Sequence, residues 1–361
     1  MSIFYLCPTY SHPVGGVRKI YRHVDFLNQS GFSAYVLHGR VGFRCRWFQN
    51  DTAIAYTRAS GLPFPLNRFK LLRRLHNRLI RGLSHSAARA ELSIVLSSTR
   101  PRLLTSNDTL VIPEILWPDG LNTRAAKVVF NQNCYLTFTS FCDLPHCATA
   151  ASPPEDLVDA MITISEDSEA YLRYAFPKVP IHRIRHYSID TDLFRPGCSK
   201  EKCIAFMPRK NAGDAKQVLH LLGQRGILRE YTIQVISGIS LEQTASILRK
   251  SRIFLSFGHP EGFGLPPAEA MACECIVIGY HGMGGREFFK PEFSYPVEAG
   301  YIVKFAEKVE HVMEQFAKAP AVMQAKAEMA SRFVRTNYGP EAERAELAAI
   351  WTKILAGRQP N

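Results

Sequence analysis

The sequence predicts an α/β protein built on parallel sheets, and three observations lead to that prediction. Residues 2–38 show an apolar run, a glycine loop, an amphipathic stretch and a second apolar run, which is the order of a βαβ unit. Further short apolar runs recur at residues 109–113, 127–130 and 160–164. Residues 253–289 show the order strand, loop, helix, strand and glycine loop, typical of a parallel sheet with binding loops at its carboxyl ends. With 361 residues, the chain is long enough for two domains of ordinary size.

The first unit begins with a buried strand at residues 2–10. A tight loop containing Gly15 and Gly16 follows, and it leads into an amphipathic helix at residues 17–28. Residues 33–38 then form the second strand of the unit. A glycine pair in such a first turn is only a weak indication of phosphate contact when it is taken alone.

The amino-terminal part of the chain carries almost all of the excess positive charge. The net charge is +12, and residues 1–150 hold 18 Lys or Arg against 7 Asp or Glu. Within residues 68–89, basic side chains are interleaved with Leu, Ile and Phe. On a helix this pattern suits either an anionic membrane surface or a core-facing helix with a solvated basic face. In general, a basic excess indicates an anionic partner such as a membrane surface, nucleic acid or a phosphorylated substrate.

Composition narrows the class of protein further. Apolar residues make up 46% of the chain and charged residues 21%, which indicates a globular protein. No apolar run approaches the roughly 20 residues of a membrane span, and no secretory signal is apparent. The nine cysteines lack paired CxxC spacing, which favours reduced thiols in a cytosol. Neither Cys142, His146 and Cys147 nor Cys273 and Cys275 form a recognisable zinc pattern, so no metal site is expected.

The strongest functional signal lies in residues 253–289. An apolar strand leads into a loop rich in Gly and Pro, and Pro266 and Pro267 then open a helix. A helix N-terminus attracts anions such as phosphates, and Glu261 and Glu269 can accept hydrogen bonds from hydroxyl groups beside such an anion. This arrangement suits a nucleotide sugar, with its sugar, diphosphate and ribose in a row. Taken singly, each acid has an equally good structural interpretation, Glu261 as a solvated loop residue and Glu269 as a residue that stabilises the helix dipole. Taken together with the glycine loop, the two acids favour the functional interpretation.

The segment EGFGLPPAEAMAC resembles the E-x7-E signature of retaining glycosyltransferases of family 4, which have the GT-B fold (glycosyl transferases group 1). The resemblance implies that Glu261 faces the donor sugar as a catalytic residue and that Glu269 binds the ribose. It also implies substrate contacts from the residues that follow Glu261, which are Gly262, Phe263, Gly264 and Leu265. Glu274 stands where the family usually has Gly. The later GGREFF resembles the family's GG-x-x-E loop, shortened by one residue, and implies that Gly284 and Gly285 offer N–H groups to the diphosphate.

Two loops of the amino-terminal half resemble the same family. The loop with Gly15 and Gly16 would lie beside the donor phosphates, on the opposite side of a cleft. After the run at residues 127–130, this chain has Asn-Gln-Asn where many members carry a His near the donor sugar. Asn133 is the nearest candidate for the role of that His.

The segment around Arg209 resembles the family's pair of cations that hold the leaving diphosphate. The second cation would be Lys210 or Lys216, because the register is loose by one residue. Such cations are needed because breaking the glycosidic bond leaves a nucleoside diphosphate with growing negative charge. Between the two halves, Asp190 and Asp192 belong to a segment that resembles the interdomain hinge, and we interpret them as a turn and cap motif rather than a metal site.

The resemblance therefore implies two Rossmann-like domains that face each other across a cleft. An acceptor-side domain would span residues 1–190 and a nucleotide-sugar domain residues 191–340. The remaining residues, 341–361, would form a helix that crosses back to the first domain.

The function implied is transfer of a hexose-type sugar from a nucleotide diphosphate sugar to an acceptor with retention of configuration, without a metal or other cofactor. The acceptor would be a cell-surface glycan or a lipid-linked saccharide. The enzyme would be cytoplasmic or peripheral at the inner face of the membrane, which residues 68–89 would contact. A sugar-nucleotide epimerase or phosphorylase on the same fold stays open, as does a non-catalytic protein that binds membrane or nucleic acid. Basic charge alone is poor evidence for nucleic acid, and no nucleic-acid partner is expected.

Overall fold

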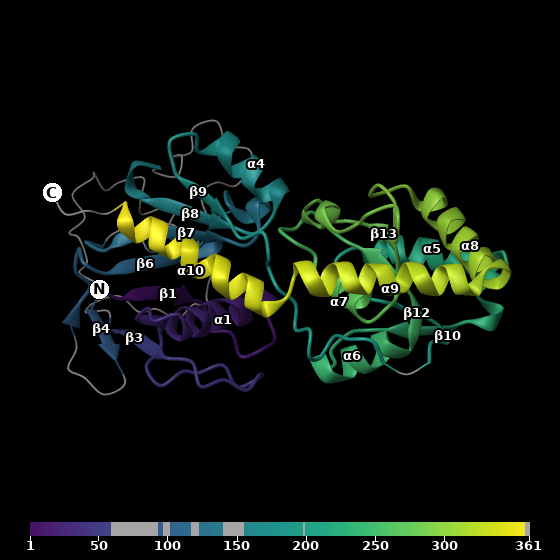
Figure 1. The fold of residues 1–361 in the computed structure, drawn as a ribbon, viewed down its shortest axis with the longest axis horizontal. Helices are drawn as coiled ribbons and strands as arrows, with labels where there is room; N and C mark the ends of the chain where they lie inside the picture. Colours follow the sequence, from purple (N-terminus) through teal and green to yellow (C-terminus); the bar gives the residue numbers. More distant parts are fainter. Residues whose placement is uncertain (59–92, 97–101, 117–122, 140–154, 198, 358–361) are drawn as a thin grey trace, which may run out of the picture.

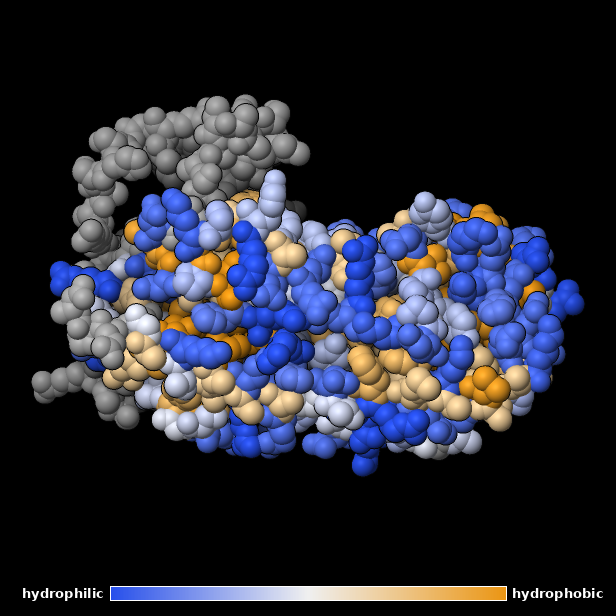
Figure 2. Space-filling model, turned by 45° about the horizontal axis from the view of Figure 1, so that its top comes forward, coloured by the Kyte–Doolittle hydropathy of each residue, from blue (hydrophilic) through white to orange (hydrophobic). Residues whose placement is uncertain are grey.

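The computed structural model describes residues 1–58, 93–96, 102–116, 123–139, 155–197 and 199–357. The basic stretch at residues 68–89 lies outside the described residues. Figure 1 shows two α/β lobes side by side, with the chain passing from the first to the second after β9. Hydrophilic side chains cover much of the face shown in Figure 2, including the waist where the lobes meet. Among the described residues, no helix combines the length and the apolar character needed to cross a membrane.

The first lobe contains a nine-stranded sheet in the order β5-β4-β3-β2-β1-β6-β7-β8-β9. Neighbouring strands pair in parallel except at β3–β4 and β4–β5, which are antiparallel. The strands are β1 Ile3–Cys7, β2 Ala34–His38, β3 Ile54–Arg58, β4 Ser93–Leu96, β5 Arg102–Leu103, β6 Thr109–Pro113, β7 Ala126–Asn131, β8 Ala160–Thr163 and β9 Ile181–Arg183. The central strands are buried on both faces, which explains why they read as continuous apolar runs in the sequence.

The second lobe contains a five-stranded sheet in the order β11-β10-β12-β13-β14, and all of its pairs are parallel. Its strands are β10 Glu201–Phe206, β11 Thr232–Val235, β12 Ser251–Phe257, β13 Ile276–Tyr280 and β14 Tyr295–Pro296. The central strands β12 and β13 are almost entirely buried. Because the carboxyl ends of parallel strands meet at one edge, the loops after β10, β12 and β13 are brought together there.

Helices cover both sheets. They are α1 Gly15–Gln29, α4 Glu166–Ala175, α5 Ala212–Gln224, α6 Leu241–Lys250, α7 Leu265–Ala272, α8 Ile302–Lys318, α9 Pro320–Asn337 and α10 Pro340–Ala356. The helix α4 begins directly after its capping residue, because the Ser165 hydroxyl accepts the Ser168 N–H at 3.1 Å. The helix α1 differs from the prediction, because Gly15 and Gly16 form its first turn rather than a preceding loop.

The last helix, α10, lies along the first lobe (Figure 1). The Trp351 indole N–H donates to the Tyr5 hydroxyl at 3.1 Å, which joins α10 to β1. Near the start of α10, the fully buried Glu343 accepts from Lys19 Nζ at 2.9 Å and lies 3.3 Å from His23 Nε2. Burial alone would raise the pKa of Glu343, but Lys19 and His23 hold that pKa well below its usual value. This buried ion pair fixes where α10 lies on α1, because leaving either charge unpaired would be costly.

The structure explains one departure from the family pattern. Glu274 follows the C-terminus of α7 with a φ of +62°, a left-handed conformation that favours glycine at this position. We therefore expect Glu274→Gly to raise the free energy of unfolding by about 0.5–1 kcal/mol, because relief of the strain exceeds the entropy cost of glycine. Chemical denaturation measures this change. A Glu274→Ala variant keeps the Cβ and should gain nothing, and an equal gain from alanine would show that strain is not the cause.

Candidate active site

The loops after β12 and β13 form the centre of the candidate site, and backbone hydrogen bonds tie them together. The Glu261 N–H donates to the Gly282 carbonyl at 3.0 Å, and the Gly284 N–H donates to the Glu261 carbonyl at 3.2 Å. Glu261 also forms an isolated parallel bridge with Met283. The predicted donor-sugar residue Glu261 is therefore held from both sides by the glycine loop.

The Glu261 carboxylate forms an ion pair with Lys210, which comes from the loop after β10. The Asn211 side-chain amide fastens that loop by donating to the carbonyls of Phe257 at 3.2 Å and Gly258 at 2.9 Å. The side chains stay partly accessible, with 33% of Lys210 and 19% of Glu261 exposed. The structure thus brings together two residues that the sequence placed 51 positions apart.

The other two predicted cations, Arg209 and Lys216, are exposed. Arg209 directly precedes Lys210, and Lys216 lies in the second turn of α5. Neither forms an ion pair with the described residues. Both are therefore available to an anionic ligand beside the Lys210–Glu261 pair.

The start of α7 presents a group of unpaired backbone donors. The N–H groups of Gly262, Phe263, Gly264 and Leu265 have no hydrogen-bond partner among the described residues. Gly264, the residue that caps the helix, has a φ of +93°, which a residue with a side chain would adopt only with strain. Such a group of donors at a helix N-terminus favours an anion.

The glycine pair after β13 differs from its predicted role. The Gly284 N–H donates to carbonyls of Glu261 and Gly282, and the Gly285 N–H donates to the His281 carbonyl at 3.1 Å. Both N–H groups are therefore engaged within the loops in this structure, because the chain turns into the short 3-10 helix η7 (Gly284–Glu287). The N–H groups without a partner in this part of the site are instead those of residues 262–265.

Glu269, the predicted ribose ligand, lies on α7 beside the first lobe. Its carboxylate is partly buried and accepts no hydrogen bond from the described residues. Burial raises the pKa of Glu269 to about 7, although the nearby Arg18 favours the ionised form. Arg18 itself is paired with Asp190 at 2.7 Å. The Glu269 carboxylate therefore lies at the junction of α1, α7 and the segment between the lobes, and none of the described residues donates a hydrogen bond to it.

The two lobes are in close backbone contact at Gly262. A Cβ atom on Gly262 would lie 2.0 Å from the carbonyl oxygen of Gln132, which follows β7 in the first lobe. A Cβ on Gly284 would in turn lie 2.1 Å from the Gly262 carbonyl oxygen. Three backbone segments therefore stack without room for a side chain, and this stacking sets the distance between the lobes.

Gln132 is a contact residue that the sequence did not single out. Its backbone N–H donates to the buried Glu114 carboxylate at 3.2 Å, and its side-chain amide donates to the Gly16 carbonyl at 3.2 Å. Its side-chain oxygen accepts from the Tyr187 hydroxyl at 3.1 Å. Burial raises the pKa of Glu114 to about 7, while the backbone N–H groups of Gln132 and Asn133 oppose that rise. The one signal in the sequence was the position of Gln132 directly after a strand.

Asn133, which the sequence favoured, uses its side chain locally. Its side-chain oxygen accepts the Tyr135 N–H at 3.2 Å and caps the short helix η3 (Cys134–Leu136). Gly15 lies closer to the site, since a Cβ on Gly15 would be 3.5 Å from Leu265 Cδ1. The N-termini of α1 and α7 therefore approach each other, and both carry partial positive charge.

The described residues contain no group of three or more His, Cys, Asp or Glu side chains that could hold a metal ion. Asp190 accepts the Leu193 N–H at 3.2 Å and pairs with Arg18. Its carboxylate is thus used by a turn and an ion pair, in line with the interpretation of the DTD segment as a turn motif.

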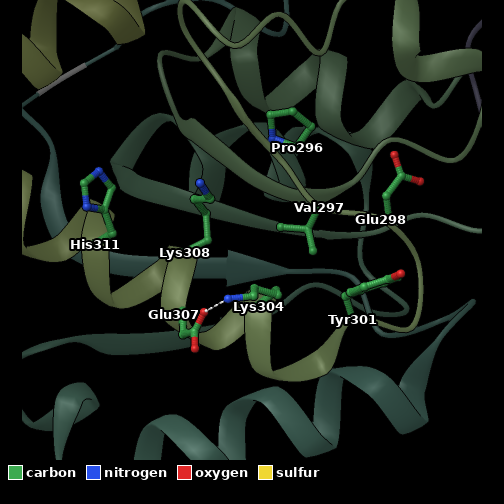
Figure 3. A pocket seen from close by; sticks show the side chains of 8 residues that line it. All are labelled: Pro296, Val297, Glu298, Tyr301, Lys304, Glu307, Lys308 and His311. Atoms are coloured by element: carbon green, nitrogen blue, oxygen red, sulfur yellow. Dashed lines mark hydrogen bonds and ion pairs between the residues drawn. The ribbon is translucent and has the colours of Figure 1, made fainter.

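A surface pocket of about 380 Å³ lies between β14 and α8 (Figure 3). Its lining carries charges of both signs, and Lys304 and Glu307, one turn apart on α8, form an ion pair at 2.8 Å on one side of it. The lining residues are Pro296, Val297, Glu298, Tyr301, Lys304, Glu307, Lys308 and His311. None of the candidate site residues lies in this pocket, so it is separate from the site described above.

Comparison with known proteins identifies the fold and a matching family model for part of the chain. Residues 213–330 match the model of the family "Glycosyl transferases group 1". An alpha-1,6-glucosyltransferase of Actinobacillus pleuropneumoniae serotype 7 is 25% identical over 267 residues, which cover 70% of this chain and 76% of that protein. The structure of HepE from Anabaena in complex with UDP and glucose aligns with a TM-score of 0.65 at 11% identity, over 98% of this chain and all of that chain.

A sucrose-phosphate synthase from Thermosynechococcus elongatus also aligns, with a TM-score of 0.63 at 13% identity over 99% of both chains. At these identities the structural likeness establishes the fold, and the family match establishes the class of enzyme. The predicted fold and the resemblance to glycosyl transferases group 1 are therefore confirmed. Residues 213–330 form a group 1 glycosyl transferase domain, and the chain is a glycosyltransferase with the GT-B fold.

Proposed function

We propose that this enzyme transfers a hexose-type sugar from a nucleotide diphosphate sugar to an acceptor hydroxyl, with retention of configuration. The observation that carries the proposal is that α7 presents two kinds of group without a hydrogen-bond partner among the described residues. These are the N–H donors of residues 262–265 and the carboxylate of Glu269. The first group suits a diphosphate and the second suits the ribose hydroxyls next to it. The Anabaena relative was solved with UDP and glucose, which supports a donor of the same kind.

In this proposal, the two lobes bind different substrates. Residues 191–340 bind the donor, residues 1–190 bind the acceptor, and the helix within residues 341–361 joins the two. Arg209, with Lys210 or Lys216, holds the diphosphate. Gly15 lies on the opposite side, at the positive end of α1.

The chemistry follows from the charges at the site. The bond between the anomeric carbon and the phosphate oxygen breaks, and the leaving diphosphate keeps the electron pair. The acceptor oxygen bonds to the same face of the anomeric carbon, and its proton passes to the departing phosphate oxygen. Arg209 and a neighbouring lysine stabilise the negative charge as it develops. Glu261 contacts the donor sugar, and it forms no covalent bond to the sugar. No metal is required, because Arg209 and the lysine neutralise the charge of the diphosphate in place of a metal ion.

The acceptor we infer is a cell-surface glycan or a lipid-linked saccharide, met at the cytoplasmic face of a membrane. The basic excess of residues 1–150 supports an anionic surface as a partner. The glucosyltransferase relative supports glucose as the sugar.

Calorimetric titration with UDP, GDP, ADP and dTDP, with and without divalent metal, tests the donor site. We expect one nucleotide to bind without metal and Glu269→Ala to weaken that binding at least tenfold, since the ribose then loses a charged acceptor. The bound nucleotide identifies the base of the donor, and incubation of its sugar conjugate with no acceptor distinguishes transfer from epimerisation. Absence of binding by all four nucleotides would overturn the proposal.

Nucleotide affinity should also depend on pH through Glu269. The pKa of Glu269 is raised to about 7, and the ionised form is the better acceptor for ribose hydroxyls. Affinity should therefore rise about tenfold between pH 6 and pH 8, as the carboxyl group loses its proton. The matched Glu269→Gln variant does not titrate at this position, so its pH dependence reports the phosphate groups of the nucleotide and the other titrating groups of the protein. Parallel curves for the two proteins would show that Glu269 does not contact the ligand.

A further inference from the structure

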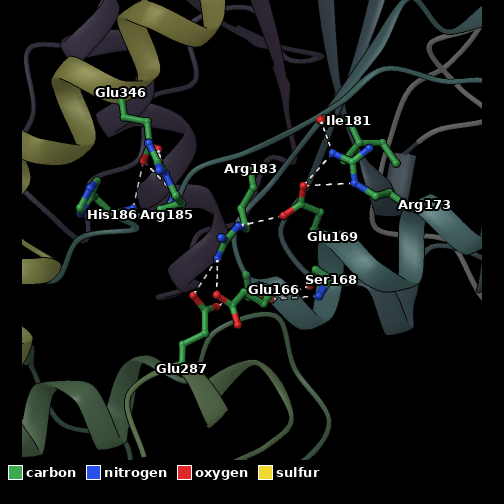
Figure 4. Close-up of polar contacts among 11 residues, drawn as sticks. Glu166, Ser168, Glu169, Arg173, Ile181, Arg183, Arg185, His186, Glu287 and Glu346 are labelled. Atoms are coloured by element: carbon green, nitrogen blue, oxygen red, sulfur yellow. Dashed lines mark hydrogen bonds and ion pairs between the residues drawn. The ribbon is translucent and has the colours of Figure 1, made fainter.

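One arginine of the first lobe is in contact with a carboxylate of the second. Arg183, the last residue of β9, lies 3.1 Å from Glu287 and 3.3 Å from Glu166 through Nη1, and its Nε lies 2.9 Å from Glu169 (Figure 4). Glu166 and Glu169 belong to α4 in the first lobe, whereas Glu287 ends η7 in the second. The Arg183 side chain is 17% exposed and that of Glu287 is 11% exposed, so solvent screens this pair only in part.

The second oxygen of Glu287 completes the cap of a helix in the other lobe. The Glu166 N–H, the first donor of α4, donates to Glu287 Oε2 at 3.0 Å. The Ser165 hydroxyl accepts from a later donor of the same turn, the Ser168 N–H. Both oxygens of Glu287 therefore bind the first lobe, one through a guanidinium and one at the positive end of a helix.

Glu287 is joined to the donor site by a short and rigid segment. It ends the single turn η7, which starts at Gly284, and Gly284 is stacked on Gly262 and bonded to the Glu261 carbonyl. Met283, directly before this turn, has a φ of +66°, a strained conformation for a residue with a side chain. A shift of Glu287 would therefore move the backbone that holds Glu261 and the unpaired donors after it.

We propose that Arg183 and Glu287 are positioning residues, which hold the Glu261–Gly264 loop in its ligand-binding geometry only while the two lobes are together. This proposal rests on the proposed function, since it assigns the loop to the donor. In this arrangement, Arg183 of the first lobe acts on the donor-binding loop through Glu287, without contacting the donor itself. Donor binding and contact between the lobes then favour each other, because each stabilises the same loop conformation.

Protonation of Glu287 gives a second way to test the pair. Burial raises the pKa of Glu287 to about 7, with Arg183 and Lys290 opposing the rise and Glu166 adding to it. Tyr338 also faces Glu287 from the segment between α9 and α10. Below pH 7, a protonated Glu287 loses its ion pair with Arg183. The contact between the lobes should therefore weaken as the pH falls from 8 to 6.

The test is a double-mutant cycle on Arg183→Gln and Glu287→Gln. Glutamine at 287 can still accept the Glu166 N–H, so that variant keeps the helix cap while losing the ion pair. Two quantities are measured for each protein: the dissociation constant for the nucleoside diphosphate that binds the wild type, and the radius of gyration in solution at pH 8 and pH 6. Arg173→Gln is the matched control, because Arg173 contacts Glu169 on the same helix and does not touch Glu287.

We expect each single variant to bind the nucleotide about tenfold more weakly and to have a larger radius of gyration than the wild type. The double variant should be no weaker than either single one, because both remove the same interaction. The wild type should expand at pH 6, whereas Glu287→Gln should not respond to pH. Losses that multiply in the double variant, or an unchanged radius and affinity in the single ones, would overturn the proposal. If the wild type binds no nucleotide, the proposed function fails, and the radius of gyration still decides whether the pair holds the lobes together.

Discussion

A Gly262→Ala variant should lose about a hundredfold in kcat/KM while remaining folded. The added methyl group would lie 2.0 Å from the Gln132 carbonyl oxygen, a distance at which one of the two backbones has to move. Gln132 has little freedom to do so, because Glu114 holds its N–H and Tyr187 and Gly16 hold its side chain. A displacement of about 1 Å between the lobes is enough to cost two orders of magnitude in rate.

The stability cost of the same change should stay within about 1–3 kcal/mol, since the overpacking is confined to the boundary between the lobes. Steady-state kinetics with the identified donor, together with the melting temperature, separates the two effects. Gly223→Ala is the control, because Gly223 lies on α5 with no atom within 4 Å of an added Cβ. That variant should keep full activity and become slightly more stable. Full activity in Gly262→Ala would mean that the lobes work at a larger separation than this structure has.

Helices whose capping residues lie beside the helix boundary could be predicted from the sequence. The helix α6, Leu241–Lys250, begins where Ser240 and Gln243 form a reciprocal capping box, which is a pattern of neighbouring residues. The helix predicted within residues 341–361 is α10, which begins at Pro340, one residue before that range. In each case the information lies within one turn of the boundary, where a single sequence can be read directly.

The parts that the sequence misplaced depend on contacts between distant segments. After β7, Asn133 caps the short helix η3, and its side chain is used there. Gln132 is left to contact Gly16 through its side chain and Gly262 of the other lobe through its carbonyl group. Gly16 likewise has a close neighbour from a distant segment, since the Gln132 amide nitrogen lies 3.2 Å from where a Cβ on Gly16 would be. The E-x7-E signature spans the loop after β12 and the first turns of α7, as the predicted order of strand, loop and helix requires. The sequence showed neither the Arg183–Glu287 pair, 104 residues apart, nor the Lys19–Glu343 pair, 324 residues apart.

Arg209→Gln should lower kcat by a factor of about 10²–10³ with little change in stability. Arg209 is exposed and makes no ion pair with the described residues, so its loss leaves no buried partner behind. If it stabilises the charge that develops on the leaving diphosphate, the effect falls on the transition state and therefore on kcat. Single-turnover rates at saturating donor measure this step apart from binding. Arg229→Gln removes an exposed arginine elsewhere in the same lobe and should leave the rate unchanged.

The same measurement on Lys210→Gln and Lys216→Gln identifies the second cation. Lys210 is paired with Glu261 before any ligand arrives, so its loss releases the Glu261 carboxylate as well as a positive charge. Lys216 has no such pair among the described residues, so its loss should affect only the anion. A kcat defect in Lys216→Gln that equals the defect in Arg209→Gln would assign the diphosphate to Arg209 and Lys216, and would leave Lys210 the task of orienting Glu261. If Arg209→Gln keeps a wild-type kcat, the leaving group is stabilised without Arg209, and the role of Arg209 as a catalytic residue is wrong.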